Sequence, residues 1–200
     1  MARKKSVRTA FLNIPYDKEF VSLFLAYVVG LIHLGLEPQP TFAIPNQGRL
    51  DAIIDLIDAS DCSIHDLSRT ETTNGVPRFN MPLELGLALH QRRVTKGKHR
   101  VFVFESKPYR TLQSTSDVNG IDPFIHHGQP KEVMTQLRNI FRKPGDTITV
   151  PDMFAVYRAV KRRLPEFKRD AGGGSLFESA IFVDIIKVAA LEDLRRRTTS

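Results

Sequence analysis

The chain has 200 residues, of which 42% are hydrophobic and 26% are charged. This length and composition are typical of a globular protein with one full core and an appendage, and they exclude two large domains. The single cysteine, Cys62, excludes an intramolecular disulfide and a zinc module built from several cysteines.

The formal net charge of +7 is confined to the two ends of the chain. Residues 1–8 hold four basic residues and no acidic one, residues 151–200 hold ten basic and seven acidic ones, and the body between them is neutral. A neutral body has no excess of basic residues to bind a phosphate backbone, so we expect no nucleic-acid partner. Because no apolar run is long enough for a secretory leader or a bilayer span, we expect a cytoplasmic protein without membrane contact.

Apolar runs and helical spacing alternate along the first two thirds of the chain. The apolar runs predict strands over residues 7–14, 40–44, 62–67 and 101–104, with a weaker one at 124–127. The segments between them predict helices over residues 17–34, 48–59, 109–118 and 130–142, and one that starts near residue 80. Strands that alternate with helices in this way indicate β-α-β units around a parallel sheet.

Two further helices are predicted after a linker, over residues 152–168 and 176–197. We therefore expect an α/β fold, a doubly wound parallel sheet of about five strands with a C-terminal helical extension. The expected parts are a basic tail, an α/β domain and a helical pair, over residues 1–8, 7–142 and 151–200. The last helix is apolar on more than one side, so we expect it to pack on the sheet domain or on another copy of itself.

One carboxylate stands out in the helix that starts near residue 80. Glu84 lies on an apolar stripe, because Met81 and Ala88 are three residues before and four residues after it. Asn80 is the predicted N-cap of this helix. The helix N-terminus favours a charged carboxylate and apolar surroundings oppose it, a balance that suits a nucleophile or a proton shuttle. The structural alternative is a carboxylate bonded to nearby backbone or paired with Arg78.

Several polar residues follow the predicted strands. In an open parallel sheet, ligands bind beyond the carboxyl ends of the strands, near the point where the strand order reverses. Each of these residues has an ordinary structural alternative, such as capping a turn or covering a helix. The residues that we expect to converge on one pocket at this edge are Asn13, Tyr16, Asp66, Ser68, Arg69, Asn80 and Glu84.

The motifs of several large enzyme classes are missing from the sequence. There is no glycine-rich phosphate-binding loop after a strand and no catalytic serine elbow. The six histidines are scattered, and His126 and His127 would point to opposite faces of a strand. We expect no metal and no other cofactor.

The Asp66 strand end and the segment Met81–Ala88, with its Met-x-x-Glu-Leu-Gly pattern, resemble a known superfamily. The chain is similar to nucleoside 2-deoxyribosyltransferases and nucleotide N-glycosidases, and more distantly to TIR-type NAD hydrolases. The resemblance covers roughly residues 7–142 and implies a flavodoxin-like sheet. It also implies a place among nucleotide-depleting effectors of bacterial stress or antiviral defence.

The resemblance implies roles for individual residues. By position, Glu84 corresponds to the nucleophile that attacks the anomeric carbon, and Asp66 to the group that contacts the base or the sugar. Asn119 is a candidate for the asparagine that family members contribute from a neighbouring subunit. Arg69 and Arg78 are natural partners of a phosphate, because guanidinium binds phosphate in bidentate fashion.

The longer third loop and the C-terminal helices depart from the transferase pattern, which leaves hydrolysis and transfer as open alternatives. We expect an N-glycosidase that acts on a nucleoside, a nucleotide or NAD, and that forms a homo-oligomer through its C-terminal helices. The first alternative is a non-catalytic nucleotide sensor that signals through those helices. A second alternative is an assembly scaffold built on them.

Overall fold

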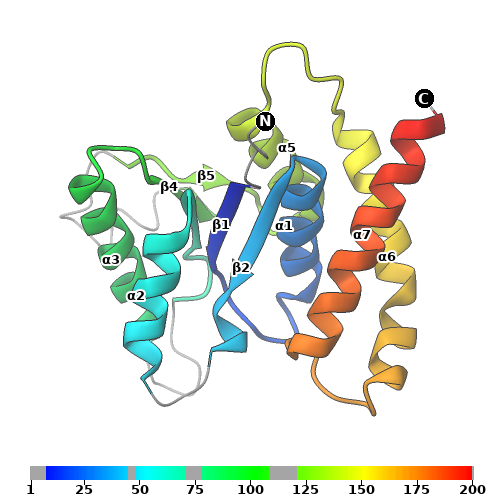
Figure 1. Ribbon diagram of the computed structural model, residues 1–200, viewed down its shortest axis with the longest axis horizontal. Coiled ribbons are helices and arrows are strands. Elements are labelled where there is room, and N and C mark those ends of the chain that lie inside the picture. Colours follow the sequence, from blue (N-terminus) through cyan, green and yellow to red (C-terminus); the bar gives the residue numbers. More distant parts are fainter. Residues whose placement is uncertain (1–7, 45–47, 71–77, 109–120, 200) are drawn as a thin grey trace, which may run out of the picture.

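The computed structural model describes residues 8–44, 48–70, 78–108 and 121–199 (Figure 1). Five strands form one all-parallel sheet with the order β2-β1-β3-β4-β5. The strands are β1 (Arg8–Asn13), β2 (Leu36–Pro40), β3 (Cys62–Asp66), β4 (Arg100–Glu105) and β5 (Phe124–Ile125). The predicted α/β class and the flavodoxin-like strand order are confirmed.

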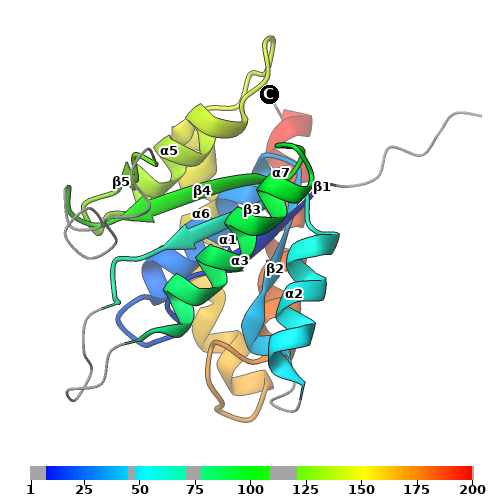
Figure 2. The ribbon, with the colours of Figure 1, turned by 90° about the vertical axis from the view of Figure 1, so that its left-hand side faces the viewer.

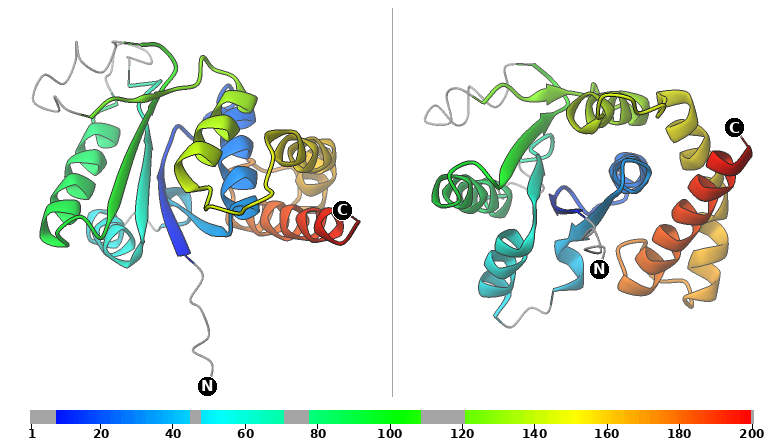
Figure 3. Two further views of the ribbon diagram at one scale, coloured as in Figure 1. Left: turned by 90° about the horizontal axis from the view of Figure 1, so that it is seen from above. Right: turned by 45° about the horizontal axis from the view of Figure 1, so that its top comes forward.

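Helices cover both faces of the sheet, and two more form an outer layer (Figure 3). On one face lie α2 and α3, on the other α1 and α5, and α6 and α7 pack outside α1. The helices are α1 (Val21–His33), α2 (Arg49–Ala59), α3 (Asn80–Val94), α5 (Pro130–Phe141), α6 (Val150–Asp170) and α7 (Ser179–Thr199), with a short 3-10 turn at Thr41–Ala43.

The outer layer explains why α1 is apolar nearly all round. A helix on the surface needs one apolar stripe, whereas α1 has neighbours on the sheet side and on the opposite side. Phe24, Leu25, Val28 and Val29 are all fully buried. Gly30 allows α5 to approach closely, since a Cβ atom there would lie 2.7 Å from Leu137 Cδ1.

The C-terminal helix packs within its own chain. Ile181, Ile185 and Ala189 are fully buried and belong to the same core cluster as α1. This is one of the two packing arrangements expected for an apolar last helix. None of the described helices has both the length and the apolar character needed to cross a bilayer.

The predicted bounds of the second strand are wrong. We expected residues 40–44, but β2 is Leu36–Pro40 and a 3-10 turn follows it. Gly35 has a φ of +73°, so it ends the preceding helix sharply and the extended chain begins at the next residue. At the edge of the sheet, β2 also tolerates proline, which lacks the N–H that an inner strand requires. The helix expected over residues 109–118 lies outside the described residues.

Candidate active site

The strand order reverses between β1 and β3, and the candidate site lies at the carboxyl end of this pair. The two strands pair in register, with Asn13 opposite His65. Asp66 is the last residue of β3, and α3 begins on the same edge after the intervening loop (Figure 2). The sheet therefore brings Asn13, Asp66 and the first turns of α3 to one edge, and the pocket expected there stays a prediction.

Glu84 is a buried carboxylate near the start of α3. Its side chain lies on the covered side of α3 with Met81, Leu85 and Ala88, and the residue is only 4% exposed. The Oε2 atom is buried and accepts no hydrogen bond from any residue that the structure describes. Arg78, the partner that the structural alternative names, instead lies 3.2 Å from Asp17 Oδ2 through its Nη1 atom. A buried acceptor of this kind is costly and uncommon in a folded protein.

Burial raises the pKa of Glu84 to about 7, and the positive charge of Arg49 acts in the opposite direction. Arg49 is the first residue of α2, and its Nη1 atom donates a 3.0 Å hydrogen bond to the Ile44 carbonyl. The pKa of Tyr16 is raised as well, mainly by burial and also by the charge of Glu84. Glu84 thus shares its electrostatic surroundings with one cation and one phenol.

Tyr16 is held by bonds at its hydroxyl group. The hydroxyl donates to the Leu12 carbonyl at 2.7 Å and accepts from the Thr41 N–H at 3.2 Å. Its ring packs edge-on against Phe42, with centroids 5.2 Å apart, and against Phe177 at 5.7 Å. The ring therefore belongs to an aromatic cluster between the sheet domain and the segment before α7.

Asn13 ties the end of β1 to the first turn of α3. Its Nδ2 atom donates to the Met81 carbonyl at 2.8 Å and to His65 Nδ1 at 2.9 Å. Because Nδ1 of His65 accepts, the ring proton lies on Nε2, a buried atom that has no partner within the described part of the chain. Burial and the neighbouring His99 lower the pKa of His65 to about 3. The interior beside α3 thus holds a neutral, unsatisfied donor as well as the unsatisfied acceptor of Glu84.

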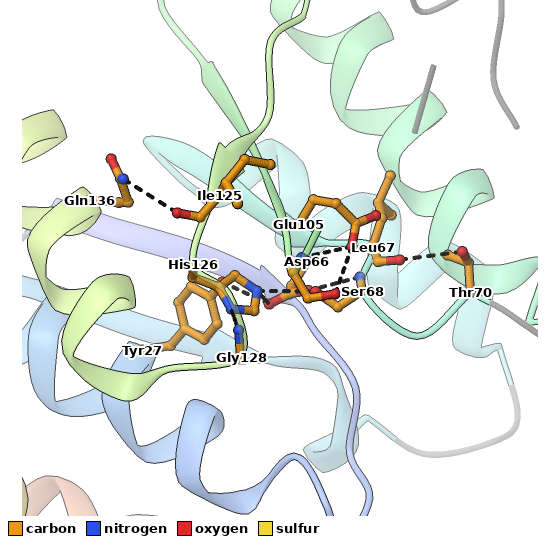
Figure 4. Close-up of polar contacts among 11 residues, drawn as sticks. Tyr27, Asp66, Leu67, Ser68, Thr70, Glu105, Ile125, His126, Gly128 and Gln136 are labelled. Carbon is orange, nitrogen blue, oxygen red and sulfur yellow. Dashed lines mark hydrogen bonds and ion pairs between the residues drawn. The ribbon is translucent and has the colours of Figure 1, made fainter. Parts of the chain in front are cut away.

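Asp66 is surrounded by donors (Figure 4). Its Oδ2 atom accepts from the Tyr27 hydroxyl at 2.8 Å and lies 3.1 Å from His126 Nε2, while Oδ1 accepts from the Ser68 N–H at 2.9 Å. The Gly128 N–H donates to His126 Nδ1, so Nε2 carries the ring proton and donates. The four side chains, which we call the Asp66 cluster, are Tyr27, Asp66, Ser68 and His126.

The Asp66 cluster joins three parts of the fold. Tyr27 comes from α1, Ser68 from the segment after β3 and His126 from the segment after β5. Asp66 and His126 are fully buried, and Ser68 is nearly so. These contacts make Asp66 a residue that stabilises the strand end, and its contact with a base or sugar stays a prediction.

Arg69 and Arg78 belong to a surface ion cluster around Asp17. Arg69 Nε lies 3.0 Å from Asp17 Oδ2, and Nη1 of the same residue contacts Glu19. The arginine side chains are about a third exposed, so they remain open to solvent. A phosphate would have to compete with these carboxylates, and the phosphate role of the two arginines stays a prediction.

The predicted capping role of Asn80 is wrong. The N-cap position is Phe79, no side chain caps it, and exposed Asn80 is the first helical residue. Asn119 lies outside the described residues. The sequence alone does not identify four residues as neighbours of Asp66 or Glu84. These residues are Tyr27, Arg49, His65 and His126. Of these, Tyr27 offered one signal, a hydroxyl group in an otherwise apolar helix.

No group of metal-ligating side chains occurs in residues 8–44, 48–70, 78–108 and 121–199. A comparison of the chain with models of known protein families finds no match, and a search of curated proteins finds none either.

Proposed function

We propose that the protein is an N-glycosidase or deoxyribosyltransferase-like enzyme that cleaves the base–sugar bond of a nucleoside, a nucleotide or NAD, with Glu84 as nucleophile. The observation that carries this proposal is the buried Oε2 atom of Glu84, which has no partner among the described residues and lies beside the reversal point of the sheet. A carboxyl group with a raised pKa, at the edge of the sheet where ligands bind in folds of this kind, is a candidate functional group.

A carboxylate suits this reaction because the transition state has oxocarbenium character. The Glu84 oxygen would bond to the anomeric carbon while the carbon–nitrogen bond breaks and its electron pair leaves with the base. Water then attacks the glycosyl ester and frees the sugar and the carboxylate. In a transferase, a second base takes the place of water.

The neighbours of Glu84 have supporting roles in this proposal. Arg49 favours the ionised, nucleophilic carboxylate against the effect of burial. Asn13 positions the first turn of α3 through the Met81 carbonyl. The Asp66 cluster holds the strand end against which a substrate would bind.

The direct test is release of free base. The protein is incubated with a panel of nucleosides, nucleotides and NAD, and the products are separated by chromatography. We expect the unmodified protein to release a base from at least one class, and Glu84→Gln to lose this activity while keeping its fold. Glu166→Gln, which changes a surface glutamate on α6, is the matched control and should retain it.

The pH profile gives the same test a second readout. Because Glu84 must be ionised to attack, the rate should rise with pH through about 7 and then level. If no member of the panel yields free base, or if Glu84→Gln releases it as fast as the unmodified protein, the proposal is wrong.

The second candidate is a nucleotide sensor, and the contacts of α1 favour it. This helix reaches the site edge through Tyr27 and Asp66, and it reaches α7 through His33 Nδ1, which lies 2.6 Å from Asp193 Oδ1. A ligand that moves the strand end would thus act on the C-terminal helices through one element. A sensor would bind a panel member in calorimetry, equally well with Glu84→Gln, and neither protein would release a base.

A further inference from the structure

The edge of the sheet opposite the candidate site gathers basic side chains. Because α3 runs antiparallel to the strands, it ends at the edge where β1 and β4 begin, toward the top of Figure 1. Strand pairing places Cys62 of β3 beside Ala10 of β1 on one side and Arg100 of β4 on the other. The segment from the end of α3 to the start of β4, residues 92–100, holds five basic residues and no acidic one.

These five residues are exposed, and none of them forms an ion pair with a residue that the structure describes. Arg8, at the start of β1, adds a sixth positive charge. Burial raises the pKa of Cys62 to about 12, and the charges of Arg100 and Arg8 oppose this rise, so both guanidinium groups lie near the strand between them. The basic edge, as we call this surface, is made of Arg8, Arg92, Arg93, Lys96, Lys98 and Arg100.

Two aspartates lie beside the basic edge without neutralising it. Burial lowers the pKa of His99, and the negative charges of Asp58 and Asp61 oppose this, which places both carboxylates near the segment 92–100. Asp61 Oδ2 accepts the Thr9 N–H at 2.8 Å and so stabilises the start of β1 rather than a basic side chain. Six basic residues against two acidic ones leave this edge with an excess of positive charge.

The turn that carries the basic edge is held in place by its backbone. The Gly97 N–H donates to the Arg92 carbonyl at 2.8 Å and ends the helix. His99 is buried, and its Nδ1 atom bonds the Ser60 carbonyl at 2.9 Å, which fixes the chain between exposed neighbours on either side. Lys96 has a φ of +53°, a left-handed conformation that glycine or asparagine adopts more easily. A lysine at this position keeps a positive charge at a backbone cost, as functional positions do.

Part of the basic edge is concave. Arg92, Arg93 and Lys96 line a hollow of about 460 Å³ together with Leu89 and Gly97. Guanidinium groups bind phosphate oxygens in bidentate fashion, and an ammonium group adds a point charge. Three cations around one hollow therefore suit a phosphate group that enters it.

The apolar residues around the basic edge distinguish between the polyanions that could carry such a phosphate. A membrane surface needs an apolar or aromatic anchor beside the basic charges, and a single strand needs exposed aromatic rings on which its bases stack. Among the described residues, Phe79 is the exposed aromatic ring, and it lies just before α3, at the opposite end of that helix. Val94, 60% exposed, is the large apolar side chain that the segment 92–100 exposes. Contacts to the phosphates of a duplex need neither an anchor nor a stacking platform.

We propose that the basic edge binds the phosphate backbone of a double-stranded nucleic acid, independently of the chemistry at Glu84. Binding of this kind is independent of base sequence and weakens steeply as salt rises, because each phosphate contact releases counterions. The expectation of no nucleic-acid partner rests on the summed charge of the body of the chain. The fold separates these charges in space and collects basic ones at one edge.

Binding of labelled duplexes, followed by fluorescence anisotropy at about 50 mM salt, tests the proposal. A DNA duplex and an RNA duplex of equal length are compared, since both present the same phosphodiester backbone, and binding of either supports the proposal. The test variant carries Arg92→Gln, Arg93→Gln and Lys96→Gln together. We expect its dissociation constant to rise about tenfold or more, and the slope of log affinity against log salt to fall by about three.

The matched control removes the same charge elsewhere. Arg162→Gln, Lys168→Gln and Arg169→Gln together change three exposed basic residues of α6, toward the bottom of Figure 1, and should leave the affinity and its salt slope unchanged. Thermal unfolding followed by circular dichroism checks that each variant is folded.

Two further probes separate the duplex from other polyanions. A single strand of the same length and vesicles of equimolar phosphatidylcholine and phosphatidylserine should both bind more weakly than the better duplex. The proposal is overturned if neither duplex binds at about 50 mM salt, or if the single strand or the vesicles bind more tightly. It is equally overturned if the test variant binds as the unmodified protein does, or if the control variant loses as much affinity.

Discussion

The two buried carboxylates near the carboxyl edge of the sheet, Asp66 and Glu84, have opposite surroundings. Asp66 accepts hydrogen bonds on both oxygens, from α1 and from the segments after β3 and β5. Glu84 has a buried oxygen without a partner among the described residues, and burial raises its pKa to about 7. Two equally buried carboxylates can therefore differ in stability, because one has donors for both of its oxygens and the other lacks a donor for one of them.

The largest change in the free energy of unfolding is expected for Asp66→Asn. The new amide group faces donors, so the Tyr27 hydroxyl and His126 Nε2 lose their charged acceptor inside the protein. We expect a loss of about 3 to 5 kcal/mol in the free energy of unfolding, measured by urea denaturation. Asp58→Asn, on the exposed side of α2, is the control and should change little. A loss below about 1 kcal/mol would mean that the donors around Asp66 do little to stabilise the folded protein.

We expect Glu84→Gln to raise the free energy of unfolding, whereas Asp66→Asn lowers it. The folded protein keeps a proton on Glu84 up to about pH 7, whereas the unfolded chain releases it near the ordinary pKa of 4.5. The unmodified protein therefore loses stability as the pH rises from about 4.5 to about 7. Glutamine removes this loss, so the variant should be more stable by up to roughly 3 kcal/mol at about pH 8, and nearly equal below about pH 4.5.

Thermal unfolding of both proteins across this pH range checks the prediction. Glu105→Gln is a useful comparison, because Glu105 is also buried but accepts bonds from Ser106. It should destabilise the protein where Glu84→Gln stabilises it. If Glu84→Gln destabilises the protein at about pH 8, the carboxylate has a structural partner and the contrast with Asp66 fails.

A smaller loss is expected for Tyr27→Phe. This change removes one donor from Asp66 and leaves the Ser68 N–H and His126 Nε2 in place. We expect a loss of about 2 kcal/mol in the free energy of unfolding, by the same denaturation measurement. A loss as large as that of Asp66→Asn would show that the cluster depends on the tyrosine alone.

The smallest effect is expected for Arg69→Met. The guanidinium group contacts Asp17 and Glu19 at the surface, where solvent screens the charges. We expect a change of less than about 1 kcal/mol in stability. If Arg69 also binds a phosphate, the variant should lose base release from nucleotides but not from nucleosides, which the chromatographic assay measures separately. Equal activity on both classes would remove Arg69 from the site.

Much of the fold follows from the sequence pattern, and so does the choice of the site edge. The inner strands β1, β3 and β4 are recognisable because each has apolar residues on both of its covered faces, most clearly in the run Val101–Phe104 of β4. The start of β2 does not follow from the sequence, because Pro38 and Pro40 disfavour a strand and only the edge position of β2 makes them acceptable. Glu84 was recognisable from its apolar neighbours at helical spacing.

The partners of the site residues did not follow from the sequence. Tyr27 is 39 residues from Asp66 and His126 is 58 residues from Ser68, so only the folded chain brings them together. The same holds for Arg49, which acts on Glu84 from another helix. Spacing along one helix identifies a buried carboxylate. Whether that carboxylate has hydrogen-bond donors depends on segments that are distant in the sequence.

The pKa of Glu84 tests most directly whether this buried carboxylate lacks the stabilising partners that Asp66 has. Side-chain carboxyl signals of the carbon-13-labelled protein are followed by NMR across a pH titration, and Glu84→Gln identifies the signal of Glu84 by its loss. We expect a midpoint near pH 7 for this signal. A midpoint at or below the ordinary value of 4.5 would contradict it, because the carboxylate would then be stabilised by partners or solvent as an ordinary glutamate is.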